Sequence, residues 1–303
     1  MKKTLIAGCV LFGAMTFSSM LLASVIKNQG PTSVMLEPGP VLPMPQASDL
    51  TDDQLLEIGI KIWQNQCGIW DRPGKVTHGM KQSITDWEAD YAQIGIGQCI
   101  WYPADEDKNF QEDWPRVAQA LKDKGYPIED WMLRACPWNN SEEFFADFNG
   151  DRLKSLRKTL AKKYLIIEQA RCIATRLDES LDKMKAAIDT ESGITEGEKT
   201  VLKQMVNENF YLVATADYPR GLYALMDYVH FKGEGVLSTE TINGVGWGLR
   251  QALEQMDDKI AAKKGAITTF VNAAIAMFPS RETNEYFKDR METYLTFNPD
   301  KVK

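Results

Sequence analysis

Residues 165–188 read LIIEQARCIATRLDESLDKMKAAI, and this stretch decides the class of fold. Its Leu, Ile and Ala side chains recur every three or four positions, which places them on one face of an α-helix. The same periodicity predicts further helices over 51–66, 112–124, 151–163, 195–213, 218–230, 246–260, 265–278 and 281–296, with a short one from Ser141. Because this content exceeds the usual third of a globular protein, we expect a mainly α protein.

Residues 67–105 interrupt the helical pattern. They are rich in glycine, contain Pro73 and Pro103, and hold the tryptophans Trp70, Trp87 and Trp101. Glycine and proline favour turns and short elements over long helices. We therefore expect an irregular or short-stranded insertion with aromatic walls inside the helical domain.

The first 50 residues have the composition of an export segment. Lys2 and Lys3 precede an apolar stretch that ends at Ala23, which is typical of a cleaved signal peptide over 1–23. An uncleaved membrane anchor is the alternative, since 5–26 could just span a bilayer. Residues 24–50 carry five prolines and predict an extended tether. The sequence thus predicts a periplasmic protein whose single folded domain covers 51–303.

The charge of the mature chain excludes one class of partner. Removal of Lys2 and Lys3 from the 35 basic residues leaves 33 against 42 acidic ones, a net charge of −9. Nucleic-acid phosphates would repel such a chain, so we expect no nucleic-acid partner.

Four cysteines remain after the signal peptide is removed, namely Cys67, Cys99, Cys136 and Cys172. In an oxidising compartment an even number can form two disulfides, with three possible connectivities. No cysteine pair has the short spacing of a zinc site, and only two histidines are present. We expect neither a metal nor a cofactor.

Two motifs flank the glycine-rich insertion. The first is WQNQC at 63–67, and the second is IGIGQCIWYP at 94–103. With the later motifs CPW at 136–138, DYVHFKGEG at 227–235 and GWGL at 246–249, they resemble a family of uncharacterised exported bacterial proteins with a lysozyme-like signature. Members of that family carry Trp-x-Asn-Glu-Cys and Gly-Ile-Gly-His-x-Ile-Trp-Tyr-Pro, and the order of these motifs is also similar to that of phage-type lysozymes. The resemblance implies a lysozyme-like helical domain and the disulfides Cys67–Cys136 and Cys99–Cys172.

The chain departs from the family at two positions. Gln66 stands where the family has glutamate, and Gln98 stands where it has histidine. Glycoside hydrolysis needs a proton donor to the leaving oxygen, usually a carboxylic acid. An amide cannot supply that proton, and its loss removes a contribution of about 10²–10⁴-fold. The departures predict a pseudoenzyme, unless Gln66 and Gln98 are ordinary helix-end and turn residues.

Aromatic side chains near the insertion are candidates for stacking on sugar rings. They are Trp87, Trp101, Tyr102 and, from the downstream motif, Trp247. Core packing is the alternative role, and it is the commoner one for aromatic residues. Gly95 and Gly97 could serve only to permit a tight turn or close backbone packing.

Three carboxylates could replace the missing acid. Glu234 is flanked by Gly233 and Gly235, where the backbone could hold it in a cleft, although it could instead be an exposed loop acid or pair with Lys232. Glu88 and Asp90, beside Trp87, are further candidates. We therefore expect a protein that binds peptidoglycan without cleaving it or that serves as a subunit of an envelope-spanning assembly. The alternative is an active peptidoglycan hydrolase using Glu234 or Glu88.

Overall fold

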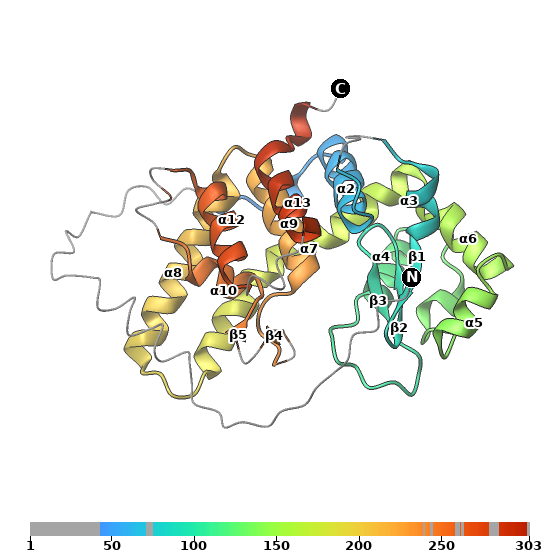
Figure 1. Ribbon diagram of the computed structural model, residues 1–303, viewed down its shortest axis with the longest axis horizontal. Helices are drawn as coiled ribbons and strands as arrows, with labels where there is room; N and C mark the ends of the chain where they lie inside the picture. The colour runs from blue at the N-terminus through green and yellow to red at the C-terminus, as the bar shows by residue number, and fades with distance from the viewer. Residues whose placement is uncertain are drawn as a thin grey trace.

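The computed structural model describes residues 43–70, 75–238, 240–242, 245–257, 261, 264–278 and 285–301. Helices dominate these residues, and a small three-stranded antiparallel sheet accompanies them (Figure 1). The predicted fold class, mainly α with a small insertion, is confirmed. The predicted signal peptide and residues 24–42 of the predicted tether lie outside the described residues.

The long helix α7 (Lys163–Thr190) runs through the middle of the molecule (Figure 1). Its buried apolar stripe packs against four other helices, which are α2 (Asp52–Gln66), α4 (Trp114–Asp123), α8 (Glu196–Thr215) and α9 (Arg220–Lys232). The α2 backbone comes close to α7 at Gly59, where a Cβ would lie 3.0 Å from Ile166 Cγ2. This contact fixes where α2 lies on α7, and with it the place where α2 ends.

Helix α2 begins at a capping box. The Gln54 N–H donates to the Thr51 hydroxyl at 3.3 Å, and the Thr51 N–H donates to Gln54 Oε1 at 3.0 Å. This exchange satisfies two of the amides that a helix start leaves open. The helix predicted over 51–66 is thereby confirmed.

The end of the predicted tether belongs to the folded body. Ala47 and Leu50 are buried, and the backbone N–H groups of Ala47 and Ser48 donate to the Asp178 carboxylate of α7 at 2.6 and 3.0 Å. The prolines prevent a long helix there, but they do not prevent a short 3₁₀ turn (η1, Ala47–Asp49) from packing. The predicted boundary at residue 50 is therefore too late by a few residues.

The insertion consists of helix α3 (His78–Ser83) and three short strands. These are β1 (Thr85–Glu88), β2 (Tyr91–Ile94) and β3 (Cys99–Trp101), which pair antiparallel in that order. The register sets Thr85 opposite Ile94 in the first pair and Ile94 opposite Cys99 in the second. The loop between β2 and β3 turns within four residues, so the Gly-Ile-Gly-Gln sequence lies at one end of the sheet.

Tryptophans anchor the sheet to the helical body. The fully buried Trp101 ring packs against Trp114, Trp131 and Trp138, with centroids 5.8 to 6.0 Å apart. Trp101 Nε1 donates to the Arg134 carbonyl at 2.7 Å. These contacts join β3 to α4 and to the 3₁₀ helix η2 (Asp130–Leu133).

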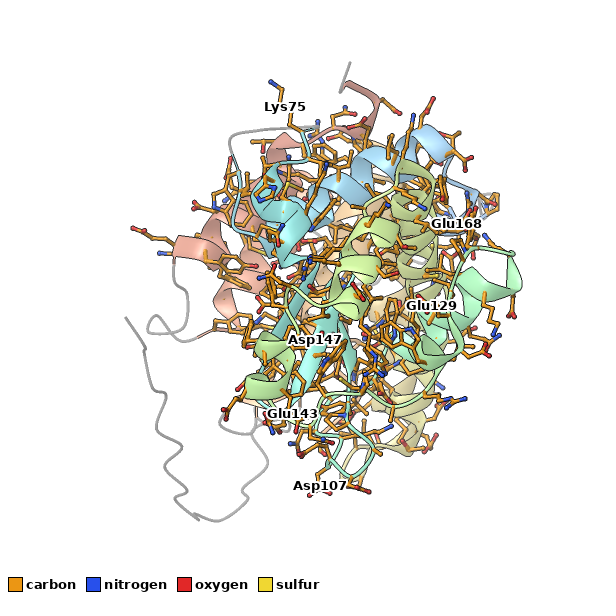
Figure 2. The ribbon with its side chains drawn as sticks, turned by 90° about the vertical axis from the view of Figure 1, so that its right-hand side faces the viewer. Lys75, Asp107, Glu129, Glu143, Asp147 and Glu168 are labelled. Atoms are coloured by element: carbon orange, nitrogen blue, oxygen red, sulfur yellow. The ribbon has the colours of Figure 1, made fainter. Side chains whose placement is uncertain are left out.

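The remaining described elements complete the helical body. They are α5 (Ser141–Ala146), α6 (Asp151–Leu160), the strand pair β4 (Thr241–Ile242) and β5 (Val245–Gly246), α10 (Leu249–Glu254), α12 (Ala266–Ala276), α13 (Glu285–Thr296) and η3 (Pro299–Lys301). Acidic side chains such as Asp107, Glu129 and Glu143 point outward on the face that carries α5 (Figure 2). Among the described helices, none combines the length and apolar character needed to cross a bilayer.

The two predicted disulfides are absent from the structure, since Cys67, Cys99, Cys136 and Cys172 are free. Cys67 Sγ lies 2.8 Å from the Ser83 hydroxyl, whereas the Cys136 N–H donates to the Tyr102 carbonyl just beyond β3. Burial raises the pKa of Cys136 to about 12 and that of Cys172 to about 11. The four side chains are thus mostly buried thiols that resist ionisation.

Candidate functional site

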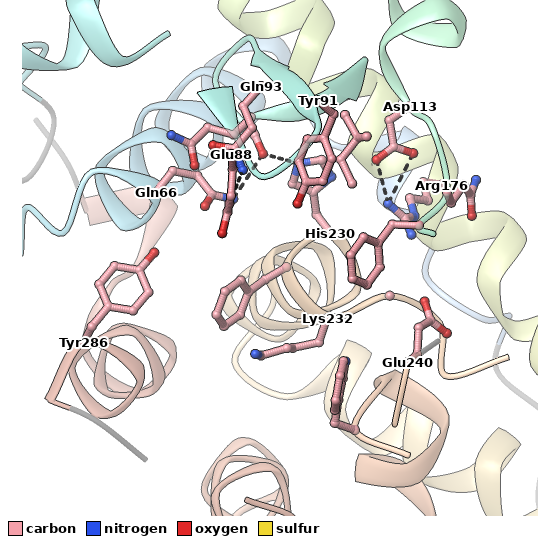
Figure 3. Close-up of a pocket in the computed structure, with 18 residues that line it drawn as sticks. Gln66, Glu88, Tyr91, Gln93, Asp113, Arg176, His230, Lys232, Glu240 and Tyr286 are labelled. Atoms are coloured by element: carbon pink, nitrogen blue, oxygen red, sulfur yellow. Dashed lines mark hydrogen bonds and ion pairs between the residues drawn. The ribbon is translucent and has the colours of Figure 1, made fainter. Parts of the chain in front are cut away.

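A cleft of about 490 Å³ opens between the small sheet and the helical body (Figure 3). One wall comes from the end of α2, from the sheet and from the β2–β3 loop. The other comes from the end of α9, from the segment that follows it and from α13. Gln66, Gln98, Glu88 and Trp247, four of the residues predicted from the sequence, lie together in this cleft.

Gln66 is the last residue of α2, and both ends of its side-chain amide are hydrogen-bonded. Nε2 donates to the Gly97 carbonyl at 3.1 Å, and Oε1 accepts from Arg290 Nη1 at 3.2 Å. A carbonyl only accepts and a guanidinium only donates, so these partners fix the orientation of the amide. A protonated glutamic acid could make the same two bonds, with its O–H directed at Gly97.

The hydrogen-bond donor to Gln66, Arg290, belongs to a buried ion pair. Arg290 and Asp227 are both fully buried, and the guanidinium donates twice to the carboxylate at 2.8 Å. Asp227 Oδ2 also accepts from the Tyr294 hydroxyl at 2.7 Å. The Arg290 guanidinium lies 3.8 Å from the centroid of the Phe231 ring, which lines the cleft. Arg290 therefore holds two cleft residues, Gln66 and Phe231, in place at once.

The β2–β3 loop owes its glycines to close packing. A Cβ on Gly97 would lie 2.0 Å from His230 Nε2, and a Cβ on Gly95, at φ +90°, would lie 2.5 Å from Gln169 Oε1. That same Gln169 oxygen accepts from the Ile96 N–H at 3.1 Å. The Gly-Ile-Gly sequence thus lets the loop settle on α7 and α9.

His230 is a neutral hydrogen-bond donor in this arrangement. Its Nε2 lies 2.7 Å from the Gly97 carbonyl, which can only accept, so Nε2 carries the proton. Burial lowers the pKa of His230, and the neighbouring Arg176 and Arg290 lower it further, while Asp113 opposes them. The Gly97 carbonyl therefore receives hydrogen bonds from both His230 and Gln66.

Three carboxylates line the cleft, and each has a different partner. Glu88 accepts from Gln93 Nε2 at 2.7 Å, and Asp113 accepts from Arg176 Nη1 at 3.2 Å. Glu240 accepts from backbone amides, and burial raises its pKa. Figure 3 shows Glu88 on the sheet side of the cleft and Glu240 on the opposite side.

Glu234, predicted as an alternative acid, does not line the cleft. It is buried, and its carboxylate accepts from Arg176 Nε at 3.1 Å and from Nη2 at 2.7 Å. Burial alone would raise the pKa of Glu234, but the hydrogen bonds and charge of Arg176 outweigh burial and lower it. Glu234 is thus held ionised in an ion pair with a residue of α7, which is the opposite of what a general acid requires.

Three of the predicted aromatic residues also lie outside the cleft lining. Trp101 is in the tryptophan cluster, and Trp87 donates from Nε1 to the Ala89 carbonyl while its ring packs on Phe144. Tyr102 is buried, with its hydroxyl accepting from the Phe110 N–H at 3.2 Å. Their role is core packing, as the alternative reading of these residues allowed.

Trp247 reaches the cleft because two glycine-containing segments pack against each other. The Leu249 N–H donates to the Gly233 carbonyl, and the Arg250 N–H donates to the Glu234 carbonyl, both at 3.0 Å. A Cβ on Gly248 would lie 2.1 Å from the Gly235 nitrogen, so only glycine fits there. The motifs at 227–235 and 246–249 are therefore neighbours in space.

Sequence reasoning missed several residues of the cleft. Tyr91, Phe110 and Tyr286 supply aromatic rings, and Gln93 and Gln111 supply further amides. Tyr91 begins the four-residue strand β2, in which buried and less buried residues do not alternate, so the sequence pattern could not separate a cleft ring from a core ring. His230 appeared only as part of the motif at 227–235, without a role of its own, and Glu240 had no pattern around it.

The chemistry of the lining is that of a polar binding site with aromatic rings. Four glutamines line it, namely Gln66, Gln93, Gln98 and Gln111, and amides both donate and accept. The Gln66 amide is already bonded at both ends, and Gln93 donates to Glu88. Within the described part of the chain, no cluster of His, Cys, Asp and Glu could hold a metal ion.

Compared with family models, with curated proteins and with solved structures, the chain gives no match in any of the three.

Proposed function

We propose that this chain is an exported, lysozyme-like protein that binds peptidoglycan in its cleft without cleaving it. The observation that carries the proposal is the state of Gln66. Its amide donates to the Gly97 carbonyl and accepts from Arg290, as a protonated glutamic acid at this position could do. The two hydrogen bonds of residue 66 thus have the same directions as those of a protonated acid. The amide, however, has no proton that it can transfer to a substrate.

The lining supports a carbohydrate ligand. Sugar hydroxyls both donate and accept, and glutamine amides match them in both roles. Aromatic rings from Phe110 and Trp247 offer flat apolar faces on which the C–H faces of a sugar ring can pack. A volume of about 490 Å³ lies within the range of ordinary small-molecule sites, so it suits one or two sugar units of a longer chain.

The experiment is a binding assay on purified peptidoglycan sacculi. We expect saturable binding of the wild type and a roughly tenfold weaker affinity for Trp247→Ala, since the variant removes an aromatic wall of the cleft. Trp87→Ala is the matched control, because its ring packs on Phe144 outside the cleft. No binding by the wild type would refute glycan recognition and would leave docking in an envelope assembly as the function. Equal losses in both variants would point away from the cleft.

A second candidate function is peptidoglycan hydrolysis with Glu240 or Glu88 as the acid. The observation that favours it is the pKa of Glu240, which burial raises as it does for many general acids. The sequence-derived choice of Glu234 has no such support, because Arg176 lowers its pKa. Release of soluble fragments from sacculi distinguishes this candidate from binding alone.

A further inference from the structure

Glu240 is a buried carboxylate in which one oxygen accepts hydrogen bonds from the backbone and the other accepts none from the described residues. Its exposed fraction is 6%, and Oε2 accepts from the Val236 N–H at 2.8 Å and from the Leu237 N–H at 3.0 Å. Among the described residues, no hydrogen bond reaches Oε1. Because Glu240 also lines the cleft, this oxygen is placed where a ligand could contact it (Figure 3).

The backbone beneath Glu240 is shaped to accept the carboxylate. Oε1 lies over Gly233, where a Cβ would come within 1.7 Å of it, and Gly233 has φ +78°. Any other residue at 233 would therefore be strained and would displace the carboxylate. Two backbone donors on one side and a glycine on the other fix the position of Glu240 before a ligand arrives.

Negative charge is in excess at this end of the cleft. Three buried carboxylates, Asp113, Glu234 and Glu240, lie near the single buried guanidinium of Arg176. Arg176 forms ion pairs with Asp113 and Glu234, and it makes no direct ion pair with Glu240. Lys183 adds positive charge, but its Nζ lies 3.7 Å from Glu234 and its side chain is 36% exposed. Lys232 also lines the cleft, but its Nζ lies over the rings of Phe231 and Phe278, at 4.2 and 4.8 Å from their centroids. Among the described residues, Glu240 is therefore the one of these three carboxylates without a direct ion pair.

We propose that Glu240 binds a primary ammonium group of the ligand, with Oε1 accepting an N–H bond from it. This inference rests on the glycan-binding function proposed above and names the chemistry that the cleft selects. A buried, preplaced carboxylate with a free oxygen needs a cation or a proton to balance it, and burial raises its pKa accordingly. In peptidoglycan such an ammonium could come from a deacetylated amino sugar or from a side-chain amine of the peptide stem.

Two matched ligand pairs test the proposal on the full-length protein by titration calorimetry. One pair is a tetramer of glucosamine and a tetramer of N-acetylglucosamine, which differ only in free amine against acetamide. The other pair is a muropeptide with a free side-chain amine and the same muropeptide acetylated at that amine. We expect the free-amine member of at least one pair to bind on the order of tenfold more tightly, and the pair that shows the preference identifies the source of the amine.

Variants then assign the preference to Glu240. Glu240→Gln keeps an oxygen for the Val236 and Leu237 amides and removes only the charge, so we expect it to fold and to lose the preference. Glu142→Gln removes the same charge from an exposed position in α5, outside the cleft lining, and we expect it to keep the preference. Equal affinity for both members of both pairs overturns the proposal while leaving glycan binding in place. A preference that Glu142→Gln loses equally, or that Glu240→Gln retains, also overturns it. No binding of any of the four ligands refutes both this inference and the glycan-binding function.

Discussion

The guanidinium of Arg290 in α13 donates to the side-chain oxygen of Gln66 at the end of α2, 224 positions away in the chain, at 3.2 Å. The same guanidinium is neutralised by Asp227 of α9. One buried cation thus joins three helices at the edge of the cleft. The hydrogen bonding of the residue 66 side chain therefore depends on Arg290 and Asp227 as well as on its own chemistry.

Gln66→Glu tests whether residue 66 occupies the position of a lost acid. We expect the variant to release soluble muropeptides from sacculi at a measurable rate, because a protonated carboxyl can keep the bond to Gly97 and then transfer its proton. Gln66→Ala is the control and should release none. If Gln66→Glu also releases no muropeptides while still binding sacculi, residue 66 is not the site of a missing general acid.

Removal of the buried Arg290 cation, which joins α2, α9 and α13, should destabilise the protein. We expect Arg290→Met to reduce the free energy of unfolding by about 3–5 kcal/mol, because it leaves Asp227 buried and uncompensated. Lys203→Met, which breaks the exposed pair with Asp189, should cost less than about 1 kcal/mol. Urea unfolding of the two variants measures the difference. Similar losses would mean that the Arg290 pair contributes no more than a surface contact.

Gly97→Ala should be destabilising for a steric reason alone, since its Cβ would meet His230 Nε2 at 2.0 Å. We expect a loss of about 1–3 kcal/mol, the usual cost of forcing an extra methyl into a packed site. Gly79→Ala is the matched control, because its Cβ would find nothing closer than 3.8 Å. That control lies in α3 and should be neutral or stabilising by up to about 1 kcal/mol. Thermal unfolding that ranks the two variants the other way would contradict the packing of the loop on His230.

The lowered pKa of His230 predicts a pH dependence of stability. The unfolded chain binds the proton at about pH 6.5, whereas the folded chain binds it only at lower pH. The contribution of His230 is therefore complete above about pH 6.5 and decreases as the pH falls from there toward the folded-state pKa. Burial raises the pKa of Glu240, so this group changes stability with pH in the opposite direction. The wild type must therefore be compared with a variant that lacks His230 but retains Glu240.

His230→Asn is that variant, since it keeps a donor for Gly97 and all the carboxyls. We expect the wild type to lose more stability than His230→Asn between about pH 7.5 and pH 5.5 in urea unfolding. Parallel pH profiles for the two proteins would show that His230 is not buried in its neutral form.

The thiols provide an independent check on the fold. We expect alkylation in denaturant, without a reducing agent, to label Cys67, Cys99, Cys136 and Cys172, because the structure has all four free. In the folded state labelling should be slow at neutral pH, since burial raises the pKa of each thiol. Two disulfides in the mass spectrum would instead support the pairing that the family resemblance implies.

Helices were predictable from the sequence because their signals are local. The periodicity of 165–188 and that of 51–66 depend on residues within a few positions, and both helices are confirmed as α7 and α2. The insertion was recognisable by its glycines, which the structure places against His230 and Gln169. The packed start at Ala47 was not, since its partner Asp178 lies 131 positions away.

The candidate site was predicted only in part, for the same reason. Gln66, Gln98, Glu88 and Trp247 meet in the cleft, but a tryptophan in a glycine-rich segment can be wall or core, and Trp101 is core. Glu234 between two glycines gave no sign of Arg176, which lies 58 positions earlier and binds it. The pairing of buried charges is decided by tertiary contacts, which no local pattern contains.

The most direct test of binding without cleavage is incubation of the wild-type protein with purified sacculi, followed by mass spectrometry of the soluble fraction. We expect the protein to sediment with the sacculi while no muropeptide appears in solution, because residue 66 is an amide held between Arg290 and Gly97. Soluble muropeptides released by the wild type and abolished by Glu240→Gln or Glu88→Gln would contradict it and identify the protein as a hydrolase.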